Sequence, residues 1–262
     1  MLDVQIVLIS ACENRKTLIK KQFEELNITI PLHFLDASTP ANSSDYLPEH
    51  YGIALNKIIC CGRSHVRAIE FASRETSPEF TIIMEDDAAI HKTHFKDIVS
   101  ELIEKWDKYV ESHSKIISLG WIPLRKYEEY LDIKSEYIFD CSLDSKILLQ
   151  NAIGLQAYML KRQTAKDLTA LMYHSTYYKF RDTLRNDIKN NKLPLFTDEW
   201  KDYSMISIDH VLNKVILQCV IFPPIIIEQR LPSLIEHSNE VAFWKNFFSN
   251  YEHERLHYWS FN

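Results

Sequence analysis

Residues 81–84, an apolar run rich in β-branched side chains, lead directly into three consecutive carboxylates, Glu85, Asp86 and Asp87. The run predicts a buried strand. Because an unpaired charge is costly to bury, three acids cannot continue through a protein core. We therefore expect them where the strand leaves its sheet, at the carboxyl edge, where open α/β sheets bind ligands.

These acids have two interpretations. In an extended chain, Glu85 and Asp87 would point to one side of the sheet and Asp86 to the other. Two carboxylates on one side offer hard oxygen ligands, which suit Mg²⁺ or Mn²⁺. The alternative is a solvated acidic turn that caps the next helix. The spacing by itself leaves both interpretations open.

The beginning of the chain predicts an α/β sheet with parallel strands. Residues 4–9 have the pattern of a buried strand, residues 17–26 have helical spacing, and residues 33–37 have the pattern of a short second strand. A β-α-β opening of this kind places consecutive strands parallel to each other.

The rest of the chain predicts further elements of the same kinds. We expect helices over 58–73, 95–110, 165–172 and 206–212, strands over 116–121, 154–160 and through 220–221, an irregular insertion or hairpin over 124–149, and a lid or acceptor loop over 174–202.

Composition excludes several functional classes. The 262 residues carry a net charge of −6, which argues against a nucleic-acid partner. The five cysteines are odd in number and irregularly spaced, which is typical of free thiols in a reducing compartment. We see no signal peptide and no apolar stretch of about 18 residues, so we expect a cytoplasmic location. The four glycines are too scattered for a phosphate-cradling loop.

Several short motifs follow one another in a fixed order. They are Cys61-Gly62-Arg63-Ser64-His65, Met84-Glu85-Asp86-Asp87, Gly154-Leu155-Gln156-Ala157-Tyr158, Ile208-Asp209-His210, and the segment from Pro224 through Gln229 to Ser233 and Ile235. This ordered set, spread over about residues 4–238, resembles glycosyltransferase family 25. That family contains the bacterial lipooligosaccharide galactosyltransferases and the collagen galactosyltransferases.

The resemblance implies a GT-A-like, nucleotide-sugar-binding α/β fold, with a mixed, mainly parallel central sheet flanked by helices. It implies a catalytic domain over residues 1–238, on which we expect an aromatic helical extension over 239–262 to pack. The implied reaction is the inverting transfer of a hexose from a UDP-sugar donor, with galactose as the first candidate. The implied acceptor is an oligosaccharide or a lipid-linked glycan.

The implied chemistry assigns roles to the acids. A divalent ion, Mn²⁺ or Mg²⁺, would offset the negative charge that builds on the departing diphosphate. Asp87 is the first candidate for a metal ligand and Glu85 the second, while Asp86 would hold a metal-bound water or contact the donor ribose. Asp209 is the candidate base for the acceptor hydroxyl, with a helix N-cap as its alternative role.

The remaining candidate residues are expected to contact the donor. Ser10, Arg15 and Asp36 follow predicted strand ends. Ser64 and His65 are expected near a helix start, where exposed amides attract phosphate or sugar oxygens. Two alternatives stay open, because Arg15 has the pattern of a solvated charge and a lone histidine is often a structural hydrogen-bond partner.

Other interpretations also stay open. The aromatic segment 239–262 is typical either of a packed closing helix or of a peripheral contact with the inner membrane face. A metal-dependent phosphoesterase or nuclease is the alternative enzyme, with His91 and His94 as additional ligands. A carbohydrate-binding protein without turnover is the third possibility.

Overall fold

The computed structural model describes residues 2–39, 53–90, 95–109, 115–121, 129–130, 132–133, 135, 137–149, 154, 156–174, 208, 212, 218–222 and 224–228. Within these residues, no helix combines the length and the apolar character that crossing a membrane requires.

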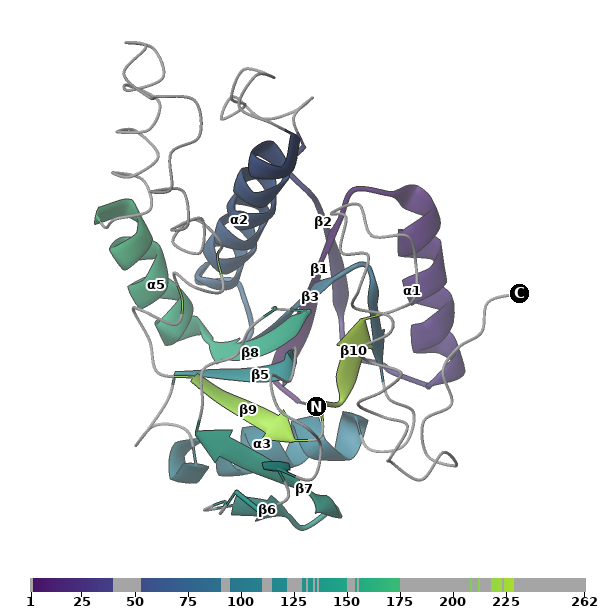
Figure 1. Ribbon diagram of the computed structural model, residues 1–262, viewed down its shortest axis with the longest axis vertical. Helices are drawn as coiled ribbons and strands as arrows, with labels where there is room; N and C mark the ends of the chain where they lie inside the picture. Colours follow the sequence, from purple (N-terminus) through teal and green to yellow (C-terminus); the bar gives the residue numbers. More distant parts are fainter. Residues whose placement is uncertain are drawn as a thin grey trace.

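An eight-stranded mixed sheet forms the centre of the fold (Figure 1). Its strands are β1 (Val4–Ser10), β2 (Leu32–Asp36), β3 (Phe80–Glu85), β5 (Ile116–Gly120), β6 (Tyr137–Phe139), β7 (Ser142–Leu149), β8 (Ala157–Lys161) and β9 (Gln218–Phe222). The strand order is β2-β1-β3-β8-β5-β9-β7-β6. Only β7 and β8 run against the common direction of the other strands, so the predicted mixed, mainly parallel sheet is confirmed.

Helices cover both faces of this sheet. They are α1 (Glu13–Glu25), α2 (Ile53–Ala72), α3 (Phe95–Tyr109) and α5 (Arg162–His174). One core cluster joins α2 and α5 to Val7 and Ile9 of β1, and a second joins α1 and α3 to Ile6 and Leu8. Because β1 is buried on both faces, its sequence is almost continuously apolar.

Most of the predicted elements are present with shifted ends. The predicted hairpin is β6 and β7, which pair antiparallel. Helix α2 begins at Ile53, five residues before the predicted start. Ser64 and His65 therefore lie inside the helix, and the prediction that they sit near its exposed amides is wrong. The predicted start at residue 58 left out the first five residues of the helix, 53–57, and so placed this motif too close to the helix start.

Some predictions concern parts of the chain outside the described residues. These parts are 239–262 and the predicted loop 174–202, apart from His174, which ends α5. Of the predicted helix 206–212, the structure describes Ile208 and Leu212, and both are helical.

The carboxyl ends of β1, β2 and β3 meet at one edge of the sheet. Ser10 at the end of β1 pairs with Asp36 at the end of β2, and Ile9 pairs with Glu85 at the end of β3. Asp86 and Asp87 then form a turn that leads into the short strand β4 (Ala88–Ile90). The acids therefore lie at the predicted edge, but they precede a strand and do not cap a helix.

A second, two-stranded sheet holds the chain that leaves this turn. Strand β4 pairs antiparallel with β10 (Ile226–Glu228), which passes over the end of β5 at Gly120. A Cβ on Gly120 would lie 2.8 Å from the carbonyl oxygen of Ile226. Glycine is thus required at this position by the close approach of two backbones.

Replacing Gly120 by alanine should therefore destabilise the protein. The added methyl group forces β10 away from β5, which we expect to cost about 1–3 kcal/mol. The measurement is the urea unfolding midpoint of the variant against that of the unmodified chain. Thr17→Ala on the exposed side of α1 is the control and should change the free energy of unfolding by less than about 0.5 kcal/mol. An unchanged midpoint for Gly120→Ala would contradict the close contact.

Candidate functional site

Asp86 is held by two side chains at the carboxyl edge of the sheet. Arg15 Nη1 donates to Asp86 Oδ1 at 2.8 Å, and Ser10 Oγ donates to Asp86 Oδ2 at 2.6 Å. All three residues are buried. The structure therefore brings three of the predicted residues together, and Arg15 is a buried ion-pair partner and not a solvated helix-start charge.

Asp87 lies beside this ion pair without a comparable partner. Its Oδ2 is 3.9 Å from Arg15 Nη1, and its Oδ1 is a buried oxygen with no hydrogen-bond partner among the described residues. Burial, together with the neighbouring charges of Glu85 and Asp86, raises the pKa of Asp87 to about 7. An acid with a raised pKa and an unused buried oxygen is typical of a functional site, and its hard oxygen fits a divalent cation.

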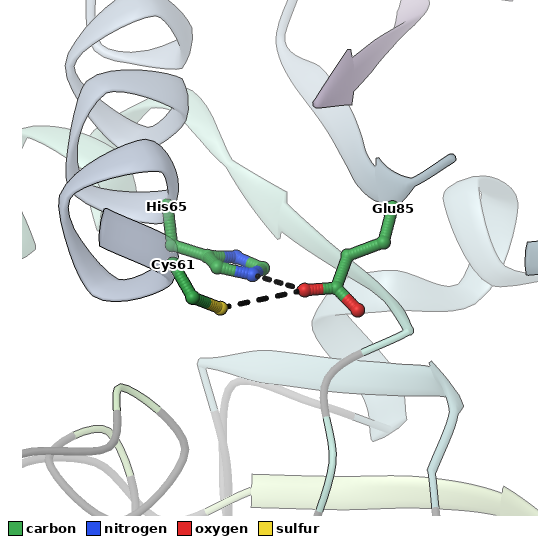
Figure 2. A group of neighbouring side chains, drawn as sticks. All are labelled: Cys61, His65 and Glu85. Atoms are coloured by element: carbon green, nitrogen blue, oxygen red, sulfur yellow. Dashed lines mark hydrogen bonds and ion pairs between the residues drawn. The ribbon is translucent and has the colours of Figure 1, made fainter. Parts of the chain in front are cut away.

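Glu85 faces α2, which covers the other face of the sheet from α1, the helix that carries Arg15. Its Oε1 lies 3.1 Å from His65 Nε2 and 3.6 Å from Cys61 Sγ (Figure 2). The other ring nitrogen, Nδ1, lies 3.2 Å from the hydroxyl of Tyr158 on β8. The burial of Tyr158, together with nearby Glu85 and Cys61, raises the pKa of this phenol well above its ordinary value. Tyr158 therefore stays protonated, and its hydroxyl donates to Nδ1 or accepts from it, according to the tautomer of His65.

Two further predicted residues stay apart from the acids. Ser64 Oγ accepts the Ser38 amide at 2.8 Å and donates to the Cys60 carbonyl at 2.8 Å, which joins α2 to the chain after β2. Asp36 is exposed and pairs with Lys16 at 2.7 Å, a contact whose hydrogen bond lowers the pKa of Asp36. Ser64 is thus a structural connector in this arrangement, and Asp36 is an accessible acid on the rim.

Sequence reasoning underestimated Cys61 and Tyr158. Neither is among the site residues expected from the sequence, and Tyr158 is fully buried. The four-residue spacing of Cys61 and His65, which places both side chains on one helix face, was the available signal. Asp209, His91 and His94 lie outside the described residues.

The two neighbouring aspartates should respond oppositely to replacement by asparagine in metal-free protein at pH 8. Because the pKa of Asp87 is raised in the folded protein, ionisation of this carboxylate destabilises the fold at pH values above the ordinary aspartate pKa. Asp87→Asn removes this charge and should therefore raise the urea midpoint. Asp86→Asn leaves Arg15 without its buried counter-ion and should cost about 3 kcal/mol.

The stabilisation by Asp87→Asn should shrink toward pH 5, where Asp87 of the unmodified folded protein is already protonated. Urea unfolding in the presence of a chelator, at both pH values, measures these effects. If Asp87→Asn lowered the midpoint at pH 8 as much as Asp86→Asn does, the unpartnered state of Asp87 would be excluded.

Comparison with known protein families finds a match that covers this edge of the sheet. The model of glycosyltransferase family 25 (LPS biosynthesis protein) matches residues 3–184. The matched span includes the acidic turn, Cys61, His65 and Tyr158. No curated protein sequence matches the chain.

Solved structures give more distant likenesses. A glycosyltransferase involved in glycosylation of the major capsid of PBCV-1 shares 10% identity, with 88% of this chain and 94% of that chain covered, at a TM-score of 0.33. Galactosyltransferase LgtC, solved with donor and acceptor sugar analogues, shares 11% identity, with 87% of each chain covered, at a TM-score of 0.38. Protein A197 from STIV shares 13% identity, with 63% of this chain and 68% of that chain covered, at a TM-score of 0.34.

At these TM-scores the likenesses carry no argument about ligands or residues of this chain. The family match is of a different kind, because it spans well over half of the sequence. This protein therefore belongs to glycosyltransferase family 25.

Proposed function

We propose that this glycosyltransferase moves a hexose from a UDP-sugar to a sugar hydroxyl of a lipooligosaccharide or a related glycan. Galactose is the first candidate for the hexose. Transfer inverts the anomeric centre and depends on Mn²⁺ or Mg²⁺, held by Asp87 with Glu85 as the second acid. The family supports the transfer of a sugar. The observation that supports the metal is the buried Oδ1 of Asp87, which has no hydrogen-bond partner in the described part of the chain and lies in a cluster of three acids.

The three acids divide their roles according to their partners. Both oxygens of Asp86 are occupied by Ser10 and Arg15, so Asp86 keeps the turn in place. Among the described residues, Asp87 Oδ1 has no hydrogen-bond partner, and Cys61 and His65 both contact Glu85 through its Oε1. A bound divalent ion supplies Lewis-acid stabilisation of the diphosphate as it leaves.

The residues around the turn complete a donor site in this proposal. Ser10, Arg15 and Asp86 set the position of the turn, and the positive charge of Arg15 would attract the diphosphate. Asp36 lies at the end of the neighbouring strand, paired with Lys16 in an exposed ion pair. Because exposed ion pairs contribute little, a donor hydroxyl can replace Lys16 at small cost. Ser64 and His65 support the site through the contacts of α2.

Asp209 remains our proposed base, on the resemblance of its motif to the family. A base must lie within hydrogen-bond reach of the attacking hydroxyl, so it acts on the acceptor and not on the donor. A lipid-linked acceptor and a peripheral membrane contact through residues 239–262 belong to the same proposal.

Activity should depend on Asp87 and on the divalent ion. With UDP-galactose, Mn²⁺ and a lipooligosaccharide core, we expect UDP release together with a lengthened glycan. Chelation of the metal, or Asp87→Asn, should lower turnover at least about a hundredfold, because several kcal/mol of transition-state stabilisation are lost. Asp140→Asn, in the exposed β6–β7 turn, is the matched control and should leave turnover unchanged.

Two outcomes would contradict this proposal. One is full turnover by Asp87→Asn, which would remove Asp87 as a metal ligand. The other is cleavage of a generic phosphodiester without any lengthened glycan, which would indicate a hydrolase.

Variants of Asp209 and Asp87 should be defective in different steps of the reaction. Asp209→Asn should lower kcat by about 10²–10⁴-fold, the usual contribution of a general base, while Mn²⁺-dependent UDP binding stays intact. Asp87→Asn should lose that binding. Calorimetric titration of UDP with Mn²⁺, beside the transfer assay, separates the two effects. If Asp209→Asn kept full kcat, the base would have to be sought elsewhere.

A further inference from the structure

A sulfur, a ring nitrogen and a carboxylate oxygen converge beside the acidic turn. Cys61 and His65 extend from α2 toward Glu85 at the end of β3 (Figure 2). The three potential ligand atoms lie within 4.8 Å of one another. Cys61 does not take part in a disulfide bond. The cluster thus offers a thiolate, an imidazole and a carboxylate from two elements that are packed against each other.

The distances suit a small tetrahedral ion. Zinc bond lengths of about 2.0–2.3 Å place the ligand atoms of one tetrahedral ion about 3.4–3.6 Å apart. Here Sγ and Nε2 lie 3.6 Å and 3.1 Å from Glu85 Oε1. All three ligand atoms lie within 4.8 Å of one another, so an ion that bound here would draw Sγ and Nε2 together by at most about 1.3 Å.

The surroundings of His65 match those of a metal ligand. The His65 side chain is only 1% exposed, and its second nitrogen already has a partner, the Tyr158 hydroxyl at 3.2 Å. Metal-binding histidines nearly always have such a partner, which fixes the orientation of the ring. The Glu85 side chain is 29% exposed, so an ion can reach the cluster from the edge of the sheet.

We propose that Cys61, His65 and Glu85 Oε1 form a second metal site, selective for a zinc-class ion, next to the ion proposed at Asp87, for which the other oxygen of Glu85 remains. The acidic turn offers only oxygen ligands, which favour Mg²⁺ and Mn²⁺, whereas sulfur and nitrogen favour zinc and cobalt. Three protein ligands leave a fourth position for water or another ligand. Binding releases the thiol proton and places the His65 ring proton on Nδ1, which donates it to the Tyr158 hydroxyl, so that Nε2 is free for the ion. The ion also links α2 to the end of β3, one residue before Asp86.

Cobalt is the probe for this site, because a thiolate bound to Co²⁺ gives a near-ultraviolet charge-transfer band that oxygen ligands do not give. The reduced, metal-free full-length chain should develop this band and saturate at one Co²⁺ per chain. Equimolar Zn²⁺ should remove the band. In a thermal unfolding assay, Zn²⁺ should raise the unfolding temperature of the same protein, since the ion binds only the folded state.

Matched variants identify the ligands. Cys61→Ser keeps a hydrogen-bonding group beside Glu85 and should abolish both the band and the thermal shift by Zn²⁺. Cys12→Ser, a half-buried cysteine just before α1, should keep both. Asp87→Asn should keep the cobalt band while losing Mn²⁺-dependent UDP binding, and Cys61→Ser should do the reverse. Each proposal can therefore be contradicted without contradicting the other.

Clear results would overturn this inference. Absence of the band from the unmodified protein would show that the cluster is only hydrogen-bonded. A band that persists in Cys61→Ser, or one that is lost in Cys12→Ser, would place the thiolate ligand elsewhere. Circular dichroism of each variant confirms that the fold is retained.

Discussion

The buried contact between Arg15 and Asp86 is the interaction on which the functional edge depends. It joins α1 to the turn after β3 across 71 residues of sequence, and Ser10 occupies the second carboxylate oxygen. A buried ion pair adds little net stability, but losing one partner costs about 3–5 kcal/mol, so such a pair mainly fixes geometry. Because Arg15 compensates the charge of Asp86, the carboxylates of Glu85 and Asp87 remain available to other partners.

Three motifs that are far apart in the sequence meet around that turn. Cys61 and His65 come from α2, Glu85 from β3 and Tyr158 from β8, and together they form one hydrogen-bonded chain. These hydrogen bonds give His65 a physical role. Anion binding by the amides of a helix N-terminus does not apply to it, because His65 lies inside α2. Family 25 membership follows from the match over residues 3–184.

Periodicity was sufficient to predict most strands and helices, because buried strands are apolar and amphipathic helices repeat at a fixed spacing. It was insufficient for the start of α2, which lies five residues before the predicted one. Arg15 shows the same limit. A cation at a helix start has the pattern of a solvated charge, and only the return of β3 beside β1 places a carboxylate within 2.8 Å of it.

The sequence by itself determined that three acids must stand at a strand end, because a core cannot hold them without partners. It also determined an α/β fold, through alternating apolar runs and helical spacing. The tertiary structure alone decided which acid is paired and which is free. Parallel pairing of β1 with β3 brings Arg15 and Ser10 to Asp86, and the packing of α2 brings His65 to Glu85. Contacts between residues so distant in sequence depend on strand order, which local pattern does not encode.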